Sequence, residues 1–267
     1  MGIRADLLLT QRGLAPSREK AKAMILAGEA FVGDERIQKA GQELPEDAEL
    51  SVKSRSLRYV SRGGFKLEAL IEGYNLDLSD AVCADIGAST GGFTDCMLQH
   101  GAKQVYAIDV GYNQLDYRLR QDPRVVVMER MNIRHFDPET LEAPVDFISI
   151  DVSFISLKLV LPVAREMLKS QGLMGVLIKP QFEAGRELVG KGGIVRDPKV
   201  HREVLNSVLN FAREQGLHLR GLTVSPIQGT HGNTEFVALL EKDAPQGGVE
   251  LEGAIEDALG KAREEFD

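Results

Sequence analysis

Residues 83–98, CADIGASTGGFTDCML, decide the fold. An apolar segment that contains the acidic residue Asp85 leads into a glycine-rich bend, and the bend leads into the start of a helix. This order is typical of the first strand, loop and helix of a sheet that binds a nucleotide-sized ligand. Gly87, Gly91 and Gly92 have no Cβ atom, so a ligand can lie against the backbone of the bend.

Two other nucleotide-binding patterns fit this loop poorly. A phosphate-binding P-loop ends in Gly-Lys-Ser or Gly-Lys-Thr, and this loop contains no lysine. A dinucleotide-binding loop reads G-x-G-x-x-G, whereas Gly87 is followed by Ala88, Ser89 and Thr90. A pyrophosphate ligand is therefore disfavoured, and a nicotinamide-dependent dehydrogenase ranks below the functions considered next.

Strands alternate with helices after Gly64, and the alternation predicts a doubly wound, mostly parallel α/β sheet that binds ligands at the carboxyl ends of its strands. Apolar strands such as FISI and GVLI are typical of a sheet covered on both faces. Because no long helix separates the last two strands, one of them is expected to run antiparallel. The expected strands are 81–86, 104–109, 124–128, 145–151, 173–179, 217–224 and 235–240, and the expected helices include 92–100, 156–170 and 198–215.

The pattern D-x-G-x-x-x-G-G-F, which begins at Asp85, resembles motif I of class I methyltransferases that use S-adenosylmethionine (SAM). The resemblance implies SAM as the cofactor, with Asp85 helping to hold its amino group. Asp109 ends the next expected strand, where a carboxylate accepts hydrogen bonds from ribose hydroxyls in nicotinamide and SAM enzymes alike. Asn132 is a candidate for the adenine edge. The candidate cofactor-binding residues are Asp85, Gly87, Ala88, Ser89, Thr90, Gly91, Gly92, Phe93, Asp109, Asn132 and Asp151.

Four polar residues mark a candidate catalytic site: Lys66, Asp151, Lys179 and Glu235. Asp151 and Lys179 end neighbouring expected strands, and an apolar strand gains nothing from burying a cation such as Lys179. Burial and a second nearby cation both lower the pKa of a lysine, whereas carboxylates oppose that shift. A hydroxyl is a weak nucleophile, so its methylation needs a base within hydrogen-bond reach. We expect Lys179 to be that base, Asp151 and Glu235 to orient it, and Lys66 to support the reacting ribose.

The lysine, aspartate, lysine and glutamate set, together with motif I, resembles the FtsJ/RrmJ-like 2′-O-methyltransferase family. The segments RYVSRGGFKL, DIGASTGGFT, DVSFISL, IKPQFE and HGNTEF are closer still to TlyA-type proteins, and this resemblance covers residues 3–241. It implies methylation of the 2′-hydroxyl of cytidine in ribosomal RNA, with ribosomal RNA or ribosomal subunits as the partner.

The first residues of the chain form a basic segment with its own pattern. Two short helices are expected at 3–12 and 17–28, and β-like pieces at 30–32, 36–37 and 49–52. This order, with GLAPSREKAKAMILAGEAFVGDERI, resembles the S-four-type RNA-binding domain of ribosomal proteins and pseudouridine synthases. Residues 1–66 hold 12 Lys/Arg and 9 Asp/Glu, whereas the rest of the chain has a net charge of −11. A basic N-terminal segment attached to an acidic remainder indicates that this segment binds a polyanion. The alternative is that its charges are simply solvated at the surface.

The expected domains are an S-four-type domain at 1–55, a basic linker at 56–64, a methyltransferase domain at 65–242, and a linker and acidic helix at 243–267. The glycine-rich segment FEAGRELVGKGGIVRDP, after Lys179, either folds over the substrate or merely connects two elements. The candidate RNA-binding residues are Arg4, Arg18, Lys20, Lys22, Lys39, Lys53, Arg55, Arg58, Arg62, Arg186, Lys191 and Arg196.

Other classes of protein are weighed against an RNA methyltransferase. An RNA-binding ribosome-assembly factor with a vestigial SAM pocket is the first alternative, and a haemolysin is the second, which the lack of any long apolar run disfavours. The five histidines have no metal-ligand spacing, so no metal is expected. Two cysteines without pairing or redox spacing, and no signal-peptide core, indicate a cytoplasmic protein.

Overall fold

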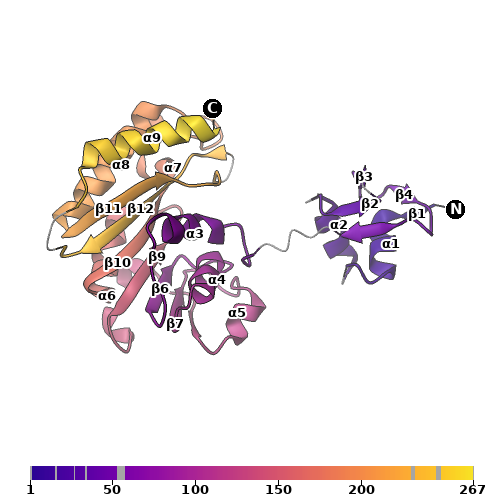
Figure 1. Ribbon diagram of the computed structural model, residues 1–267, viewed down its shortest axis with the longest axis horizontal. Coiled ribbons are helices and arrows are strands. Elements are labelled where there is room, and N and C mark those ends of the chain that lie inside the picture. The colour runs from indigo at the N-terminus through magenta and orange to yellow at the C-terminus, as the bar shows by residue number, and fades with distance from the viewer. Residues whose placement is uncertain are drawn as a thin grey trace. The chain divides into compact units, whose positions relative to one another are not determined.

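The computed structural model describes residues 2–15, 17–26, 28–33, 35–52, 58–229, 232–244 and 248–266. The chain forms two compact units, Met1–Arg58 and Tyr59–Asp267, and each is described by itself (Figure 1). Lys53 and Arg55, two of the expected RNA-binding residues, lie outside the described residues.

The first unit packs two helices against short antiparallel strands. Leu8, Leu9, Ile25 and Ile37 are almost fully buried in its core. The first helix begins two residues later than expected, because residues 3 and 4 pair with a strand that is too short to leave a sequence pattern. The elements are β1 (Ile3–Arg4), α1 (Ala5–Gln11), α2 (Arg18–Leu26), β2 (Ala30–Val32), β3 (Glu35–Arg36), β4 (Glu43–Leu44) and β5 (Leu50–Val52), with β2 between β3 and β5 and with β1 paired to β4.

The second unit contains a seven-stranded sheet in the order β11-β12-β10-β9-β6-β7-β8. Strand β12 is antiparallel to both of its neighbours, and the other recorded pairs are parallel. The prediction of a doubly wound α/β sheet with one reversed strand among the last two is therefore confirmed. The strands are β6 (Val82–Ile86), β7 (Gln104–Ile108), β8 (Val125–Met128), β9 (Val145–Ile150), β10 (Leu168–Ile178), β11 (Leu217–Val224) and β12 (Phe236–Lys242).

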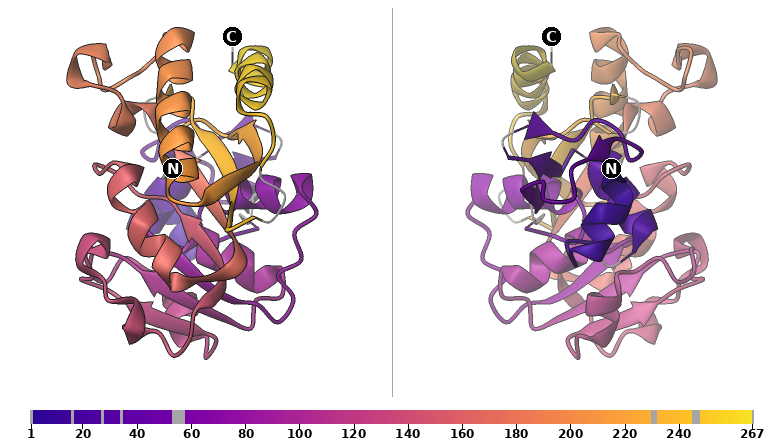
Figure 2. Two further views of the ribbon diagram at one scale, coloured as in Figure 1. Left: turned by 90° about the vertical axis from the view of Figure 1, so that its left-hand side faces the viewer. Right: turned by 90° about the vertical axis from the view of Figure 1, so that its right-hand side faces the viewer.

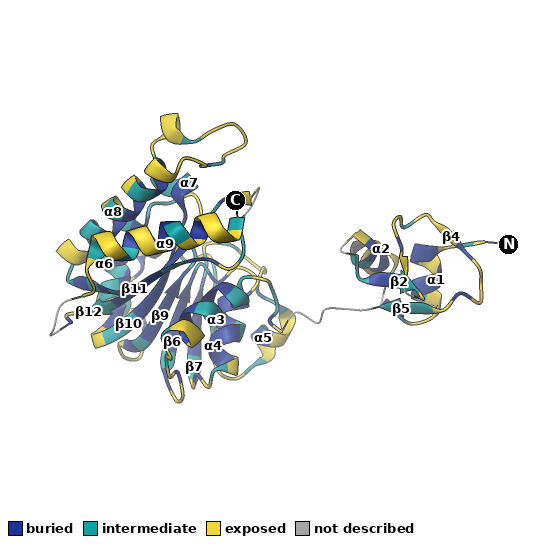
Figure 3. Ribbon diagram, turned by 45° about the horizontal axis from the view of Figure 1, so that its top comes forward, coloured by how far each residue is buried: buried dark blue, intermediate teal, exposed yellow. Residues whose placement is uncertain are grey.

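Helices cover both faces of this sheet. Successive residues of a strand point to opposite faces, and along β12 Val237 and Leu239 join one core cluster whereas Ala238 and Leu240 join the other. Figure 3 shows the strands buried between the helical layers, and Figure 2 shows the same layers from two sides. One cluster includes residues of α3 (Gly64–Gly73), α4 (Gly92–Gln99) and α5 (Tyr117–Gln121), and the other includes residues of α6 (Leu161–Met167), α8 (Pro198–Glu214) and α9 (Leu251–Phe266).

One expected helix differs in its bounds, and two further segments pack into the second unit. The helix expected over 156–170 consists of a short 3₁₀ turn, η3 (Leu157–Leu159), and α6, because Leu168 already pairs with Val145 and starts β10. The linker expected over 56–64 ends earlier, since Tyr59 is 2% exposed within the core of the second unit. Helix α9 packs on β11 and α8 through Ile255 and Leu259, so it is an integral layer of the fold.

Candidate active site

The carboxyl ends of the parallel strands converge on one edge of the sheet, as expected for ligand binding in this fold. Asp151 follows β9 directly, and Lys179 follows β10 directly. Glu235 precedes β12, and because β12 runs in the opposite direction, its start lies beside the end of β10: Phe236 pairs with Ile178. Because β12 is antiparallel to β10, Glu235 lies at the same edge of the sheet as Lys179.

A cavity of about 640 Å³ opens at this edge, and a smaller one of about 110 Å³ adjoins it. Gly87, Ser89 and Asp151 line both cavities. A Cβ atom at Gly87 would lie 2.3 Å from the carbonyl oxygen of Asp151, and its φ of +85° favours glycine. The residues of the expected loop that line the smaller cavity are Gly87, Ala88, Ser89, Thr90, Gly92 and Phe93.

The segment before α3, which contains Ser61, packs against the glycine-rich loop at Gly92. A Cβ atom at Gly92 would lie 2.3 Å from Oγ of Ser61, so the second glycine of the pair permits this close approach. Gly91, with a φ of +96°, faces Leu115 and Leu119 instead of a cavity.

Asp109 and Asn132 both line the larger cavity. The Asp109 carboxylate accepts hydrogen bonds from the backbone N–H groups of Ser89 (2.8 Å) and Gly111 (2.6 Å), which fixes its direction. Asn132 caps the following 3₁₀ turn, η1 (Ile133–His135), by accepting from the N–H of Arg134. Both residues are therefore positioned by local hydrogen bonds at the wall where a nucleoside is expected.

Asp85 lies in β6, directly before the glycine-rich loop, as expected. Its side chain is fully buried beneath the loop and lines neither cavity. One carboxylate oxygen accepts from the backbone N–H and hydroxyl of Thr94, and the other accepts from the hydroxyl of Ser149. Burial raises the pKa of Asp85 to about 6 against these hydrogen bonds. Asp85 thus ties the start of α4 to the sheet, and the expectation that it helps to hold the amino group of SAM stays a prediction.

The four expected catalytic residues form two ion pairs. Nζ of Lys179 lies 2.6 Å from Oδ1 of Asp151, and Nζ of Lys66 lies 2.5 Å from Oε2 of Glu235. Lys66 reaches this edge from the first turn of α3, which packs on β12. Both lysine side chains are 10% exposed, so these cations are held in a largely desolvated environment.

Neighbouring polar groups hold the two pairs in place. Lys179 also donates to Oγ of Ser153 (3.0 Å), and Gln181 donates to the second oxygen of Glu235 (3.2 Å). Oδ1 of Asp151 is buried, and apart from the close Lys179 amine no described group donates a well-aligned hydrogen bond to it. The Lys179 ammonium group therefore supplies the charge that offsets the burial of this oxygen.

The glycine-rich segment after Lys179 is anchored at its far end. Asn233 is 2% exposed, accepts from the N–H of Val195 and donates to the carbonyl of Gly193. The imidazole of His201 bonds to the carbonyl of Val195 at 3.0 Å. Sequence patterns assign neither Asn233 nor His201 an anchoring role. Asn233 belongs to the segment HGNTEF, but its hydrogen-bond partners are 38 and 40 positions away along the chain. The cationic residues of this segment are exposed: Arg186, Lys191 and Arg196.

Phe154 is a further residue that the sequence did not single out. It lines the larger cavity, yet it is 90% exposed and has a φ of +62°, a strained conformation for a bulky residue. Its ring lies 4.8 Å from that of Phe182, over which the Lys179 ammonium also lies. Strain and exposure of an aromatic ring together indicate a binding role.

Two of the expected RNA-binding arginines have structural partners. Asp6 is fully buried, and the guanidinium groups of Arg4 and Arg18 both donate to it. The two arginines hold the pKa of Asp6 at about 2. Each arginine side chain is nevertheless nearly half exposed. The remaining described candidates are all exposed: Lys20, Lys22, Lys39, Arg58 and Arg62.

Comparisons with known proteins identify this arrangement. The family model described as FtsJ-like methyltransferase matches residues 59–242, which is the second unit without α9. The chain belongs to the FtsJ-like methyltransferase family. SAM is accordingly the methyl donor of this FtsJ-like methyltransferase.

Relatives cover nearly the whole chain. YqxC of Bacillus subtilis is 51% identical over 98% of this chain and 93% of its own length. The 16S/23S rRNA (cytidine-2′-O)-methyltransferase TlyA of Mycobacterium tuberculosis is 40% identical over 97% of both chains. A solved structure from Streptococcus thermophilus, described as a hemolysin, has a TM-score of 0.79 and 47% identity, over 99% of this chain and 97% of that one.

The larger cavity suits the cofactor of this FtsJ-like methyltransferase. Its volume of about 640 Å³ lies within the range of small-molecule sites. The Asp109 carboxylate lines this cavity, where it can accept hydrogen bonds from ribose hydroxyls. Gly87 has no Cβ atom, so the cofactor can lie against the backbone of the loop. Asp151 lines this cavity and also forms the ion pair with Lys179. Within the described residues, no helix combines the length and apolarity that crossing a bilayer requires.

Proposed function

We propose that this FtsJ-like methyltransferase methylates the 2′-hydroxyl of a cytidine ribose in ribosomal RNA. The observation that carries the proposal is the pair of Lys179 and Asp151, in which a largely buried amine lies beside a carboxylate that lines the cofactor cavity. The name of the M. tuberculosis relative, TlyA, supports the same substrate. Ribosomal RNA as substrate also implies that the protein acts in the cytoplasm.

Lys179 acts as the base in this proposal. When bound, SAM supplies an electrophilic methyl group on a sulfonium cation, which also opposes a further positive charge nearby. In the proposed step, the Lys179 ammonium first gives a proton to solvent, and its amine then accepts the proton of the ribose hydroxyl as the hydroxyl oxygen attacks the methyl group. Asp151 and Ser153 hold the resulting ammonium group through the contacts they already make. Lys66, fixed by Glu235, provides a cation that stabilises the developing charge on the ribose oxygen.

Phe154 binds the target nucleotide in the same proposal. A ribose inside a helical stack cannot approach an amine that is largely buried beside the cavity wall, so the nucleotide must be turned out. An exposed aromatic ring at the cavity mouth offers the stacking surface that an unstacked base requires. Three exposed cations of the glycine-rich segment after Lys179 then contact phosphates of the RNA: Arg186, Lys191 and Arg196.

The first unit, assigned as the S-four-type domain, binds structured RNA through its exposed lysines. Lys20, Lys22 and Lys39 are exposed, so their ammonium groups are accessible to phosphates. Arg4 and Arg18 offer their outer N–H groups while their inner ones hold Asp6. Because this unit supplies affinity and the second supplies chemistry, both are needed for substrate selection.

Transfer of a labelled methyl group tests the function. Purified full-length protein is incubated with SAM and ribosomal subunits from a strain that lacks the gene, and methylated riboses are mapped on the extracted RNA. We expect label at cytidine 2′-oxygens. SAM binding without transfer to any ribosomal substrate would favour an assembly factor with a vestigial pocket, and dye release from protein-free vesicles would favour a haemolysin. Either result would overturn the proposal.

A further inference from the structure

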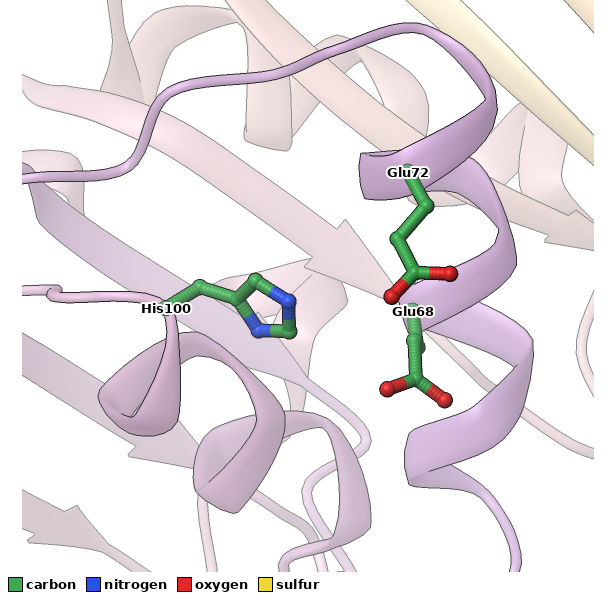
Figure 4. Close-up of side chains that lie close together, drawn as sticks. All are labelled: Glu68, Glu72 and His100. Atoms are coloured by element: carbon green, nitrogen blue, oxygen red, sulfur yellow. The ribbon is translucent and has the colours of Figure 1, made fainter.

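Helices α3 and α4 carry a second cluster of potential ligand atoms, outside the catalytic edge. Glu68 and Glu72 are one turn apart on α3, and His100 lies at the end of α4 (Figure 4). One ligand atom from each residue lies within 4.8 Å of the others. Glu68 follows Lys66 by two residues, which is about 200° around the helix, so the cluster faces away from the Lys66 ion pair.

The tautomer of His100 leaves one ring nitrogen available to a metal. Nδ1 lies 2.8 Å from the carbonyl oxygen of Cys96, and because a carbonyl can only accept, Nδ1 carries the hydrogen. Neutral Nε2 then presents a lone pair. This arrangement, in which one nitrogen donates to the backbone and the other is bare, is the one that metal-binding histidines adopt.

The two glutamates complete a ligand set. Tyr59 donates its hydroxyl to Oε1 of Glu68 at 2.8 Å, which orients that carboxylate as an outer hydrogen bond orients a metal ligand. In the described part of the chain, neither the Glu72 carboxylate nor Nε2 of His100 has a hydrogen-bond or ion-pair partner. Figure 4 shows the three side chains projecting into the same space between the helices.

We propose that Glu68, Glu72 and His100 bind a zinc ion that links α3 to the end of α4. Two carboxylates at close range repel each other, and a divalent cation relieves that repulsion. Calcium and magnesium prefer oxygen ligands alone, whereas an imidazole directs the site toward zinc. Ligand atoms around tetrahedral zinc lie roughly 3.3 Å apart, so the site closes by a rotation of the exposed Glu72 side chain, and water takes the fourth position.

Zinc titration of the metal-free, full-length protein without a histidine tag tests this site. At pH 7 we expect calorimetry to show one zinc ion bound per chain. Loss of an outer-shell partner alone weakens metal binding by about 10- to 100-fold, so His100→Ala and Glu72→Gln should each weaken it by at least as much. His135→Ala, which removes an exposed histidine outside the cluster, should leave zinc affinity unchanged.

Thermal unfolding gives a second readout that does not depend on methyl transfer. A ligand that binds only the folded state raises the unfolding temperature with its concentration. Zinc should therefore raise the Tm of the wild type and of His135→Ala, but not that of His100→Ala. Equal zinc affinity in the wild type and in His100→Ala, or no binding by the wild type at zinc concentrations that saturate ordinary protein sites, would overturn the proposal.

Discussion

The amine of Lys179 lies 2.6 Å from the Asp151 carboxylate because β9 and β10 are neighbours and each of these residues is the first after its strand. Parallel strands end at the same edge, so adjacency in the sheet brings together two side chains that are far apart in the sequence. Only Asp151 of the two lines the cofactor cavity, which leaves Lys179 one layer behind the wall. In the proposed reaction, the substrate hydroxyl approaches the amine from the side of Ser153, which lines the cavity and contacts Lys179.

Replacement of Lys179 by methionine should abolish methyl transfer and leave SAM affinity nearly unchanged. The change removes the proton acceptor but preserves the volume, and loss of a general base typically lowers the rate by about 10²- to 10⁴-fold. Single-turnover transfer of labelled methyl measures the rate, and calorimetry measures SAM affinity. Lys199→Met, which removes an exposed lysine, is the matched control. Undiminished transfer by Lys179→Met would exclude this lysine as the base.

Glu235 should be more important to stability than Lys179, because its partner Lys66 is almost buried. Glu235→Leu leaves that cation without a counter-charge, and breaking a buried pair from one side costs about 3–5 kcal/mol of unfolding free energy. The double variant Lys66→Met/Glu235→Leu should recover most of this stability but no activity. Urea unfolding and methyl transfer measure the two effects separately. A double variant as unstable as the single one would contradict this account.

The sequence predicted the sheet, and the meeting of the four candidate catalytic residues at one of its edges, better than the contacts of individual residues. Apolar strands and the loop at Gly87 are encoded by short-range patterns, so they are predictable from the sequence. The burial of Asp85 is not, because it depends on Ser149 from another strand. Arg18 resembled a phosphate ligand, yet its charge is partly taken up by Asp6, 12 positions away. Contacts such as Asp85 with Ser149 and Arg18 with Asp6 form only when distant segments fold together, so they cannot be predicted from local sequence patterns.

The pH dependence of stability should reveal the buried Asp85. Because its folded-state pKa is raised from 3.8 to about 6, the folded protein retains this proton at pH values where the unfolded chain has lost it. Its contribution is therefore greatest below pH 4 and declines as the pH rises through 6, by about 3 kcal/mol in total. Asp85→Asn has no such titration. We expect the difference in unfolding free energy between wild type and Asp85→Asn to fall between pH 4 and 7, and a constant difference would contradict the raised pKa.

Binding of RNA by the first unit should depend on Lys20, Lys22 and Lys39. Their replacement by alanine in the full-length protein removes cations without touching the buried Asp6. Log affinity falls as log salt concentration rises. The removal of each lysine that neutralises a phosphate should make this slope less steep by about 0.7 to 0.9. Fluorescence anisotropy with a ribosomal RNA fragment at several salt concentrations measures this slope.

The same number of exposed lysines in the second unit provides the control for that experiment: Lys103, Lys169 and Lys261. Their replacement by alanine changes the net charge equally but leaves the first unit intact. SAM affinity should be the same for both triple variants and the wild type. An equal loss of RNA affinity in the two triple variants would show that net charge, and not this surface of the first unit, determines binding.

Phe154 should affect RNA more than it affects the fold. Phe154→Ala removes a ring that is 90% exposed, and alanine keeps the Cβ atom that disfavours a positive φ, so the unfolding free energy should change little. If the ring stacks on the target base, its loss costs about 1–3 kcal/mol of binding, which corresponds to a roughly 5- to 150-fold fall in kcat/KM for the RNA. Phe154→Tyr keeps the stacking surface and should retain most of the activity. The decisive comparison is the KM for SAM, which should change little. If Phe154→Ala weakens SAM binding as strongly as RNA binding, the ring binds the cofactor and not the target base.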